Sequence, residues 1–256
     1  MRTIAATRYN ILLQYRHGFY AVYGLVSLLY VGFLLSVGSR LRSFLTPIFI
    51  FSDPAMLGLY FIGGILLLER EDNTLQSVSV TPLRVGEYLL AKVISLSILA
   101  VGTALVLAVA GAVGVAGAGG LSVRWAILTI GVLLTSTLMT LVGIAIASRT
   151  DSIVRYVFAA TPLMLVLSLP LLTLVPSIAS PLFFIIPTHA SLTLIVGAFE
   201  AGSISHGEIA ASLVLLAGWH VPAWQWAARS FARYGLGIDR ATGFASADNA
   251  TEVTHV

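Results

Sequence analysis

Residues 93–116, VISLSILAVGTALVLAVAGAVGVA, form one apolar run that contains no Asp, Glu, Lys or Arg. A helix rises 1.5 Å per residue, so about 20 residues cross the hydrocarbon core of a bilayer. The whole chain has a similar character, because 58% of its 256 residues are hydrophobic, only 10% are charged and the mean hydropathy is +0.96. Soluble domains average about 25% charged residues. The sequence therefore predicts an all-α polytopic membrane protein.

Outward from residues 93–116, five more apolar runs have the length of a membrane span: 18–38, 48–68, 125–147, 156–175 and 209–228. A seventh run, 182–199, is broken by Pro187, Thr188 and His189. We therefore expect six transmembrane helices, with short external helices in residues 176–208 between the fifth and sixth spans.

The placement of Lys and Arg predicts the orientation, because these residues are retained on the cytoplasmic side during insertion. With six spans and a cytoplasmic N-terminus, only Arg40, Arg42 and Arg124 lie outside, and the other 11 of the 14 Lys and Arg residues lie inside. A seventh span would move three C-terminal arginines outside. We expect a multi-pass protein of the plasma membrane with both termini in the cytoplasm.

The two ends of the chain have compositions of their own. One helical face of residues 1–17 and the next turn carries Ile4, Ile11, Leu12, Tyr15 and Phe19, although Arg8 interrupts it. Polar residues lie opposite, so this segment predicts an amphipathic helix in the cytoplasmic interface. An alternative is a signal peptide ending near Gly38, but the apolar run is longer than the usual signal core. We expect residues 18–240 to form one membrane domain and residues 241–256 to form a disordered tail.

Several function classes are disfavoured. The chain has no Cys, no His-Glu-x-x-His zinc motif and no Gly-x-Ser-x-Gly elbow, so enzymatic chemistry is not expected. The predicted spans hold almost no ionisable residues. Asp53, before Pro54, is interpreted as a helix cap or, alternatively, as part of a cargo path. His220 lies among tryptophans and is interpreted as a belt or packing residue rather than a proton relay.

A translocation path is the least defined of the predicted features. Pro162 and Pro170 both interrupt the predicted fifth span and favour a kink. The candidate path residues are Asp53, Tyr60, Phe61, Pro162 and Pro170.

Residues 69–92, EREDNTLQSVSVTPLRVGEYLLAK, hold seven of the 25 Asp, Glu, Lys and Arg residues and lie directly before the 93–116 run. Asn73 is a good helix cap for the short segment TLQSVSV, on which Leu75 and Val78 share one side. Thr81-Pro82 begins another helix that continues through Lys92. We call residues 69–92 the elbow. It is interpreted either as a solvated loop with helix caps or as a contact surface for a partner.

The elbow resembles the corresponding loop of permeases in the type-2 ABC exporter family. The matching residues are Glu69-Arg70-Glu71, Asn73-Thr74-Leu75, Val80-Thr81-Pro82-Leu83 and Glu87 to Lys92. Asn73 stands where Gly is common in that family. The VTPLR and EYLLAK segments are similar to drug-export permeases of Gram-positive bacteria, including fluoroquinolone permeases.

The resemblance implies a coupling helix that docks into a separate ATP-binding subunit. The residues it assigns to this contact are Glu69, Arg70, Glu71, Asn73, Thr74, Leu75, Gln76, Val78, Thr81 and Pro82. It also implies two ATP-binding subunits, a second permease that is identical or homologous, and export of a drug-like or amphipathic substrate. Lipids, polysaccharides and peptides are other cargoes of the family.

The chain has no ATP site of its own. Its only lysine, Lys92, follows Ala91, so no Gly-Lys-Ser/Thr phosphate loop is present. We expect no cofactor on this chain, ATP and Mg in the partner subunit, membrane lipid around the spans, and no nucleic acid. Two rival functions are a secondary carrier that does not use ATP and a membrane scaffold or assembly protein that transports nothing.

Overall fold

The computed structural model describes residues 2–52, 57–71, 85–113, 123–174, 181–199 and 204–235, and every regular element among them is helical. The first half of the chain forms α1 (Arg2–Arg16), α2 (Phe19–Ser36), α3 (Ser39–Ile50), α4 (Leu57–Glu71) and α6 (Val85–Ala112). The second half forms α7 (Trp125–Ala147), α8 (Ile153–Ser168), η2 (Leu169–Leu174), η4 (Pro181–Ile185), α9 (Pro187–Phe199), α10 (His206–Ser230) and η5 (Phe231–Gly235). The all-helical fold class is confirmed.

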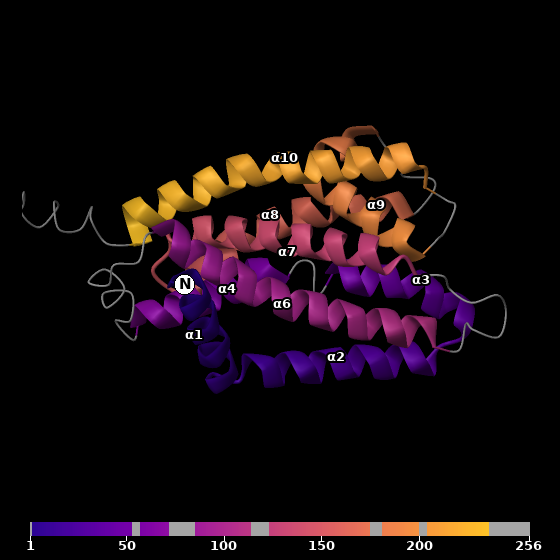
Figure 1. The fold of residues 1–256 in the computed structure, drawn as a ribbon, viewed down its shortest axis with the longest axis horizontal. Helices are drawn as coiled ribbons and strands as arrows, with labels where there is room; N and C mark the ends of the chain where they lie inside the picture. The colour runs from indigo at the N-terminus through magenta and orange to yellow at the C-terminus, as the bar shows by residue number, and fades with distance from the viewer. Residues whose placement is uncertain are drawn as a thin grey trace, which may run out of the picture.

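The long helices run beside one another along the longest axis of the molecule. Figure 1 shows α2, α6, α7 and α10 in this direction, with α1 crossing it at one end. α7 is central and mostly buried, whereas α2 and α8 are mostly exposed. The exposed side chains of α2 and α8 are largely apolar, for example Leu25 and Phe158 at 61% and 77% exposure. An apolar outer surface of this kind suits a bilayer rather than water.

Four helical segments in the described part of the chain are long and apolar enough to cross a membrane. They are α2, α6, α7 and the combined α8 and η2, Ile153–Leu174. α7 has the bounds predicted for the fourth span. α6 starts at Val85 in the elbow and continues into the third predicted span, so residues 85–92 are helical, as the sequence predicts. α10 covers the sixth predicted span, but its Trp, His and Gln residues lower its hydropathy.

The second predicted span, 48–68, is divided between two helices. α3 ends at Ile50, and α4 begins at Leu57 on the other side of the Asp53-Pro54 pair. Proline has no backbone N–H and disfavours helical geometry in the residue before it, so this pair favours an interruption. Asp53 itself lies outside the described residues. The six-span layout therefore stays a prediction.

Arg42 belongs to α3 rather than to an external loop, which corrects the simple loop placement. It is 9% exposed, and its guanidinium donates to the carbonyl oxygens of Leu34, Leu35 and Val37 at 2.6, 3.1 and 3.0 Å. It also donates to the carbonyl of Val113. The last carbonyls of a helix have no partner within the helix. Arg42 thus joins the C-terminal ends of α2 and α6.

Short helices do connect the fifth and sixth predicted spans, as expected. The helical run breaks at Ile186, and Pro187 is the first residue of α9. Proline fits this position because the first N–H groups of a helix have no partner within the helix. α9 is largely buried and its Ala198 carbonyl accepts the Arg124 backbone N–H at 2.8 Å, which places α9 beside the start of α7.

A capping box begins α10. The Ser205 hydroxyl accepts the Glu208 backbone N–H at 3.2 Å, and the Ser205 N–H donates to the Glu208 carboxylate at 2.8 Å. The Ser205 backbone N–H, and to a smaller extent the Ser205 hydroxyl, lower the pKa of Glu208, because their hydrogen bonds favour the charged carboxylate. The reciprocal bonds satisfy two donors at the helix start.

α4 and α7 pack unusually closely. A Cβ on Gly58 would lie 2.8 Å from the Ser136 carbonyl oxygen, and a Cβ on Gly143 would lie 2.8 Å from that of Leu59. Both distances are too short for real side chains, so these positions need glycine. Small residues permit such close approach of helices in membranes. As a result, α4 cannot shift far without carrying α7 with it.

Candidate functional site

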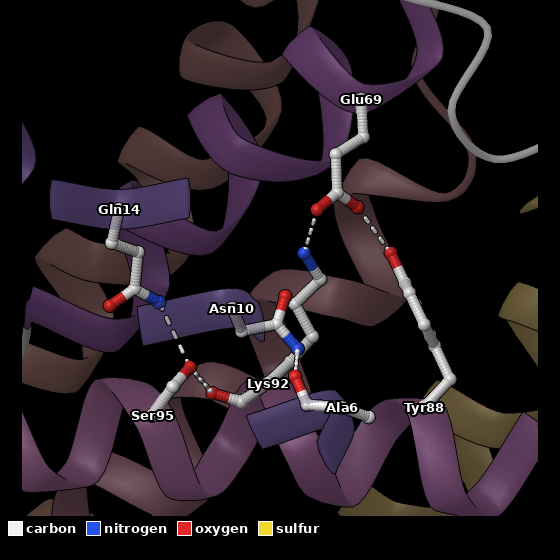
Figure 2. A network of polar contacts seen from close by, with 7 residues as sticks. All are labelled: Ala6, Asn10, Gln14, Glu69, Tyr88, Lys92 and Ser95. Atoms are coloured by element: carbon white, nitrogen blue, oxygen red, sulfur yellow. Dashed lines mark hydrogen bonds and ion pairs between the residues drawn. The ribbon is translucent and has the colours of Figure 1, made fainter. Parts of the chain in front are cut away.

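The elbow is rooted in a buried polar cluster formed by Glu69, Tyr88 and Lys92. Glu69 lies in the last turn of α4 at 6% exposure, and Lys92 on α6 is fully buried. The Lys92 ammonium forms an ion pair with one carboxylate oxygen of Glu69, and the Tyr88 hydroxyl donates to the other. Figure 2 shows Glu69 between these two donors. Tyr88 and Lys92 are four residues apart, so they lie on the same face of α6.

The pairing explains how two opposite charges are tolerated inside the bundle. A buried charge without a partner is strongly unfavourable, whereas a paired carboxylate with two donors is accommodated. Glu69 and Lys92 are also the first and last residues of the elbow, near the end of α4 at Glu71 and the start of α6 at Val85. The ion pair therefore holds the end of α4 close to the start of α6, and we call these two helix ends the roots of the elbow.

α1 joins the same cluster through its polar face. Gln14 donates from Nε2 to the Ser95 hydroxyl at 2.9 Å, and this hydroxyl donates to the Lys92 carbonyl at 2.9 Å (Figure 2). Gln14 is 2% exposed, whereas Ile4 and Tyr15 are 74% and 71% exposed. The amphipathic pattern of α1 thus turns its polar face to α6 and its apolar face outward. That arrangement suits a helix bordered by lipid.

Arg70 ties α4 to the end of α7. Its guanidinium donates to the carbonyl oxygens of Thr150 and Ser148, at 2.7 and 3.2 Å. These carbonyls follow the last turn of α7, where unpaired acceptors and the negative end of the helix dipole favour a cation. Arg42 makes the same kind of contact at the opposite end of the molecule.

α10 and η5 complete the surroundings of the cluster. The Tyr88 ring stacks on Phe231 with 5.0 Å between centroids. Arg149, just after α7, lies 5.6 Å from the Trp226 ring centroid and donates to the Ser230 hydroxyl at 3.3 Å. We use the name elbow junction for Glu69, Arg70, Tyr88 and Lys92. Together with these neighbours, the junction connects α1, α4, α6, α7 and α10.

The structure gives the predicted elbow residues different environments. Glu69 and Arg70 point into the protein and have partners there, whereas Glu71 is exposed. Glu69 and Arg70 therefore hold helices together, and their predicted contact with an ATP-binding subunit stays a prediction. The remaining predicted contact residues lie outside the described residues: Asn73, Thr74, Leu75, Gln76, Val78, Thr81 and Pro82.

The candidate path residues are spread over several surfaces. Phe61 packs against Phe19 and Tyr23 of α2, with ring centroids 5.4 and 5.0 Å apart, while Tyr60 beside it is half-buried. Pro162 is exposed on α8, and Pro170 is buried in η2, where α8 changes from α to 3-10 geometry.

His220 has a packing role. Its Nε2 lies 2.7 Å from the Thr137 hydroxyl and its Nδ1 lies 2.8 Å from the Leu216 carbonyl oxygen. The ring therefore joins α10 to α7, which agrees with the interpretation preferred from the sequence. Within the described ranges, no three His, Asp or Glu side chains are grouped so that they could hold a metal ion.

Among the described residues, Lys92 and Arg42 are buried cations that sequence reasoning missed. Lys92 is the only lysine and lies at the start of a long apolar helix. A charge in that position indicates that an acidic partner lies nearby. The sequence did not show that this acidic partner was Glu69, because the partners lie on different helices. Arg42 had no such signal, since its partners are backbone carbonyls.

Helices that are long and apolar enough to cross a membrane, packed around the central helix α7, define a polytopic α-helical membrane protein. A family model described as the fluoroquinolones export permease protein family matches residues 1–238. The chain belongs to this family. Two fluoroquinolones export permease proteins of Mycobacterium tuberculosis, from strains CDC 1551 / Oshkosh and H37Rv, are similar to it. Each is 28% identical over 214 residues, which cover 83% of this chain and 87% of the relative.

Proposed function

We propose that this chain is the membrane-spanning permease subunit of an ATP-driven ABC exporter that moves a drug-like, amphipathic molecule out of the cell. Its relatives are named for fluoroquinolone export, so a fluoroquinolone is the first cargo to test. The observation that carries the proposal is the elbow junction. It connects both roots of the charged elbow to the helices of the bundle.

The partners follow from what this chain lacks. It has no phosphate loop, so two separate ABC ATP-binding subunits bind ATP with Mg and hydrolyse the ATP. A second permease subunit, identical or homologous, completes the transporter in the lipid bilayer, and no nucleic acid takes part. Leu75 and Val78 form the apolar side of a coupling helix that docks into the ATP-binding subunit.

The proposed mechanism is mechanical. When the ATP-binding subunits close, they push on the elbow, and the Glu69–Lys92 pair transmits the displacement to α4 and α6 together. α7 follows, because Arg70 and the close glycine contacts hold it to α4. α2 and α8 are less enclosed, so the inner helices move relative to them and open a path between the two permease subunits.

The proposed orientation places the elbow and both termini in the cytoplasm of a bacterial cell and residues 176–208 outside. It rests on the distribution of Lys and Arg. Because the chain has no cysteine, Ser203→Cys and Ser246→Cys each introduce a single thiol. In intact cells, an impermeant maleimide is expected to label the variant at 203 and not the variant at 246. The opposite labelling pattern would contradict the orientation.

The proposed function is tested by purifying the tagged chain from its native membrane in mild detergent. An ABC ATP-binding subunit is expected to co-purify, and a fluoroquinolone is expected to stimulate ATP hydrolysis by the complex. The permease separated from its partner is expected to hydrolyse no ATP. A secondary carrier or a scaffold predicts no associated ATPase and no stimulation.

A further inference from the structure

The outer face of α1 carries two arginines among apolar side chains. Its large exposed apolar and aromatic residues are Ile4, Tyr9, Leu12 and Tyr15. Arg8 and Arg16 are exposed as well. Residues four apart lie on one face of a helix, so Arg8 stands about one turn before Leu12 and Arg16 about one turn after it. Arg8, which interrupts the apolar stripe in the sequence, is thus one of a pair.

Neither of these arginines has a partner within the described part of the chain. The guanidinium groups of Arg8 and Arg16 make no hydrogen bond and no ion pair there, whereas those of Arg42 and Arg70 donate to backbone carbonyls. No carboxylate is close to them in sequence either, because the first acidic residue of the chain is Asp53. The outer face of α1 therefore presents positive charge that the described residues do not neutralise.

The direction of α1 suits a helix that lies along a membrane surface. α1 crosses the direction of α2, which is long and apolar enough to span a membrane (Figure 1). Gly18 makes the turn between the two helices with a φ of 76°, a conformation that favours glycine. Asn10 and Gln14, on the polar side of α1, are buried at 4% and 2% exposure. The face that carries Arg8 and Arg16 is therefore turned away from the bundle and toward the surrounding lipid.

The side chains of this face match lipids that carry a net negative charge. A guanidinium is planar and can donate to two phosphate oxygens at once. An arginine stem can also lie along apolar neighbours while its charge reaches the headgroups, and tyrosine rings are common at the same level. A zwitterionic lipid already holds a cation beside its phosphate. The apolar residues alone would accept any lipid, so the two arginines supply a preference for anionic headgroups.

We propose that the outer face of α1 binds anionic phospholipids. Arg8 and Arg16 pair with their phosphate groups, and the apolar residues between them contact the upper parts of the acyl chains. On its inner face, α1 is bonded to α6, because Gln14 donates to the Ser95 hydroxyl at 2.9 Å. The bound headgroups therefore hold the first turns of α6 at the level of the membrane surface. The inference goes beyond the proposed function, since it concerns neither the cargo nor the ATPase.

The test measures which lipid lies beside α1 in the full-length chain. Because the chain has no cysteine, Ala5→Cys introduces a single thiol for a fluorophore at an exposed position of α1. The labelled chain is reconstituted in phosphatidylcholine vesicles that contain either brominated phosphatidylglycerol or brominated phosphatidylcholine, whose bromine atoms quench a nearby fluorophore. Stronger quenching by the anionic lipid at equal mole fraction gives its enrichment at α1. We expect Arg8→Gln and Arg16→Gln each to lower this enrichment by about fivefold.

Two further variants of the labelled chain serve as controls. Arg8→Lys keeps the positive charge and is expected to keep most of the enrichment. Arg40→Gln removes the same charge from an exposed arginine of α3, at the end of the molecule opposite α1, and should leave quenching at residue 5 unchanged (Figure 1). The exposed arginines of α1 hold no contact in the described part of the chain, so these substitutions should not disturb folding.

The other outcomes overturn the inference in different ways. Equal quenching by the two brominated lipids would show that α1 has no preference for negative charge. Quenching by neither lipid would show that a protein surface covers this face instead. Enrichment that survives in the double variant of Arg8 and Arg16 would assign the anionic lipid to other residues. An equal loss in Arg40→Gln would reduce the effect to the net charge of the chain. None of these results affects the proposed function, because the measurement uses neither ATP nor a drug.

Discussion

Replacing Lys92 by methionine is expected to destabilise the permease by about 3–5 kcal/mol, because it leaves the buried Glu69 carboxylate without its ion-pair partner. Glu69→Gln leaves the opposite charge unpaired and is expected to have a similar effect. In the double variant no charge remains buried, so most of the stability should return. Unfolding of the purified protein in detergent, followed by tryptophan fluorescence, measures all three variants.

The chain contains a matched control for this experiment. Arg155 and Asp151 form an ion pair at 3.0 Å on the surface, with side chains 72% and 53% exposed. Exposed pairs contribute little, so Arg155→Ala should change stability by no more than about 1 kcal/mol. Wild-type stability in both single variants of Glu69 and Lys92 would show that the elbow junction does not hold α4 and α6 together.

The double variant also separates folding from coupling. If the ion pair transmits force, the neutral pair should fold and still assemble with the ATPase, but a fluoroquinolone should stimulate hydrolysis less than in the wild type. If the pair only stabilises the bundle, hydrolysis should recover together with stability.

Leu75→Asp and Val78→Asp are expected to abolish assembly with the ATP-binding subunit. Each variant places an unpaired carboxylate in the proposed docking contact, which is typically unfavourable by several kcal/mol. The permease itself should still insert and fold, because the spans are unchanged. The measurement is co-purification of the ATPase and drug export at matched levels of membrane expression.

Ser77→Asp is the control for the docking prediction, since in the predicted TLQSVSV helix residue 77 would lie on another face from Leu75 and Val78. It adds the same charge to the same segment and should leave assembly intact. A solvated loop predicts that all three variants change stability and assembly by no more than about 0.5 kcal/mol. Normal assembly and export by both test variants would reject the coupling-helix assignment.

Much of the fold was predictable because membrane spans are encoded locally. The run 125–147 coincides with α7, and residues 156–174 of the predicted fifth span lie in α8 and η2. The break before α9 was also evident from Pro187, whose ring and missing N–H restrict the backbone wherever it occurs. These features depend on a few consecutive residues, and the sequence displays them directly.

Features that depend on contacts between distant helices were not predictable in the same way. Glu69 and Lys92 both stood out as charges in the elbow, but their pairing requires α4 to lie beside α6. The inward turn of Gln14 required α1 to pack on α6. Arg42 was counted only as an external charge, because nothing in its neighbourhood shows that it caps the ends of α2 and α6.

The central claim is that ATP hydrolysis by a partner drives export through this permease. Its most direct test is fluoroquinolone uptake into inside-out membrane vesicles from cells that express the chain with its ATPase. The account predicts uptake that requires hydrolysable ATP, continues after an uncoupler collapses the proton gradient, and is lost in Leu75→Asp. Uptake that needs no ATP and stops when the gradient collapses would contradict it and establish a secondary carrier instead.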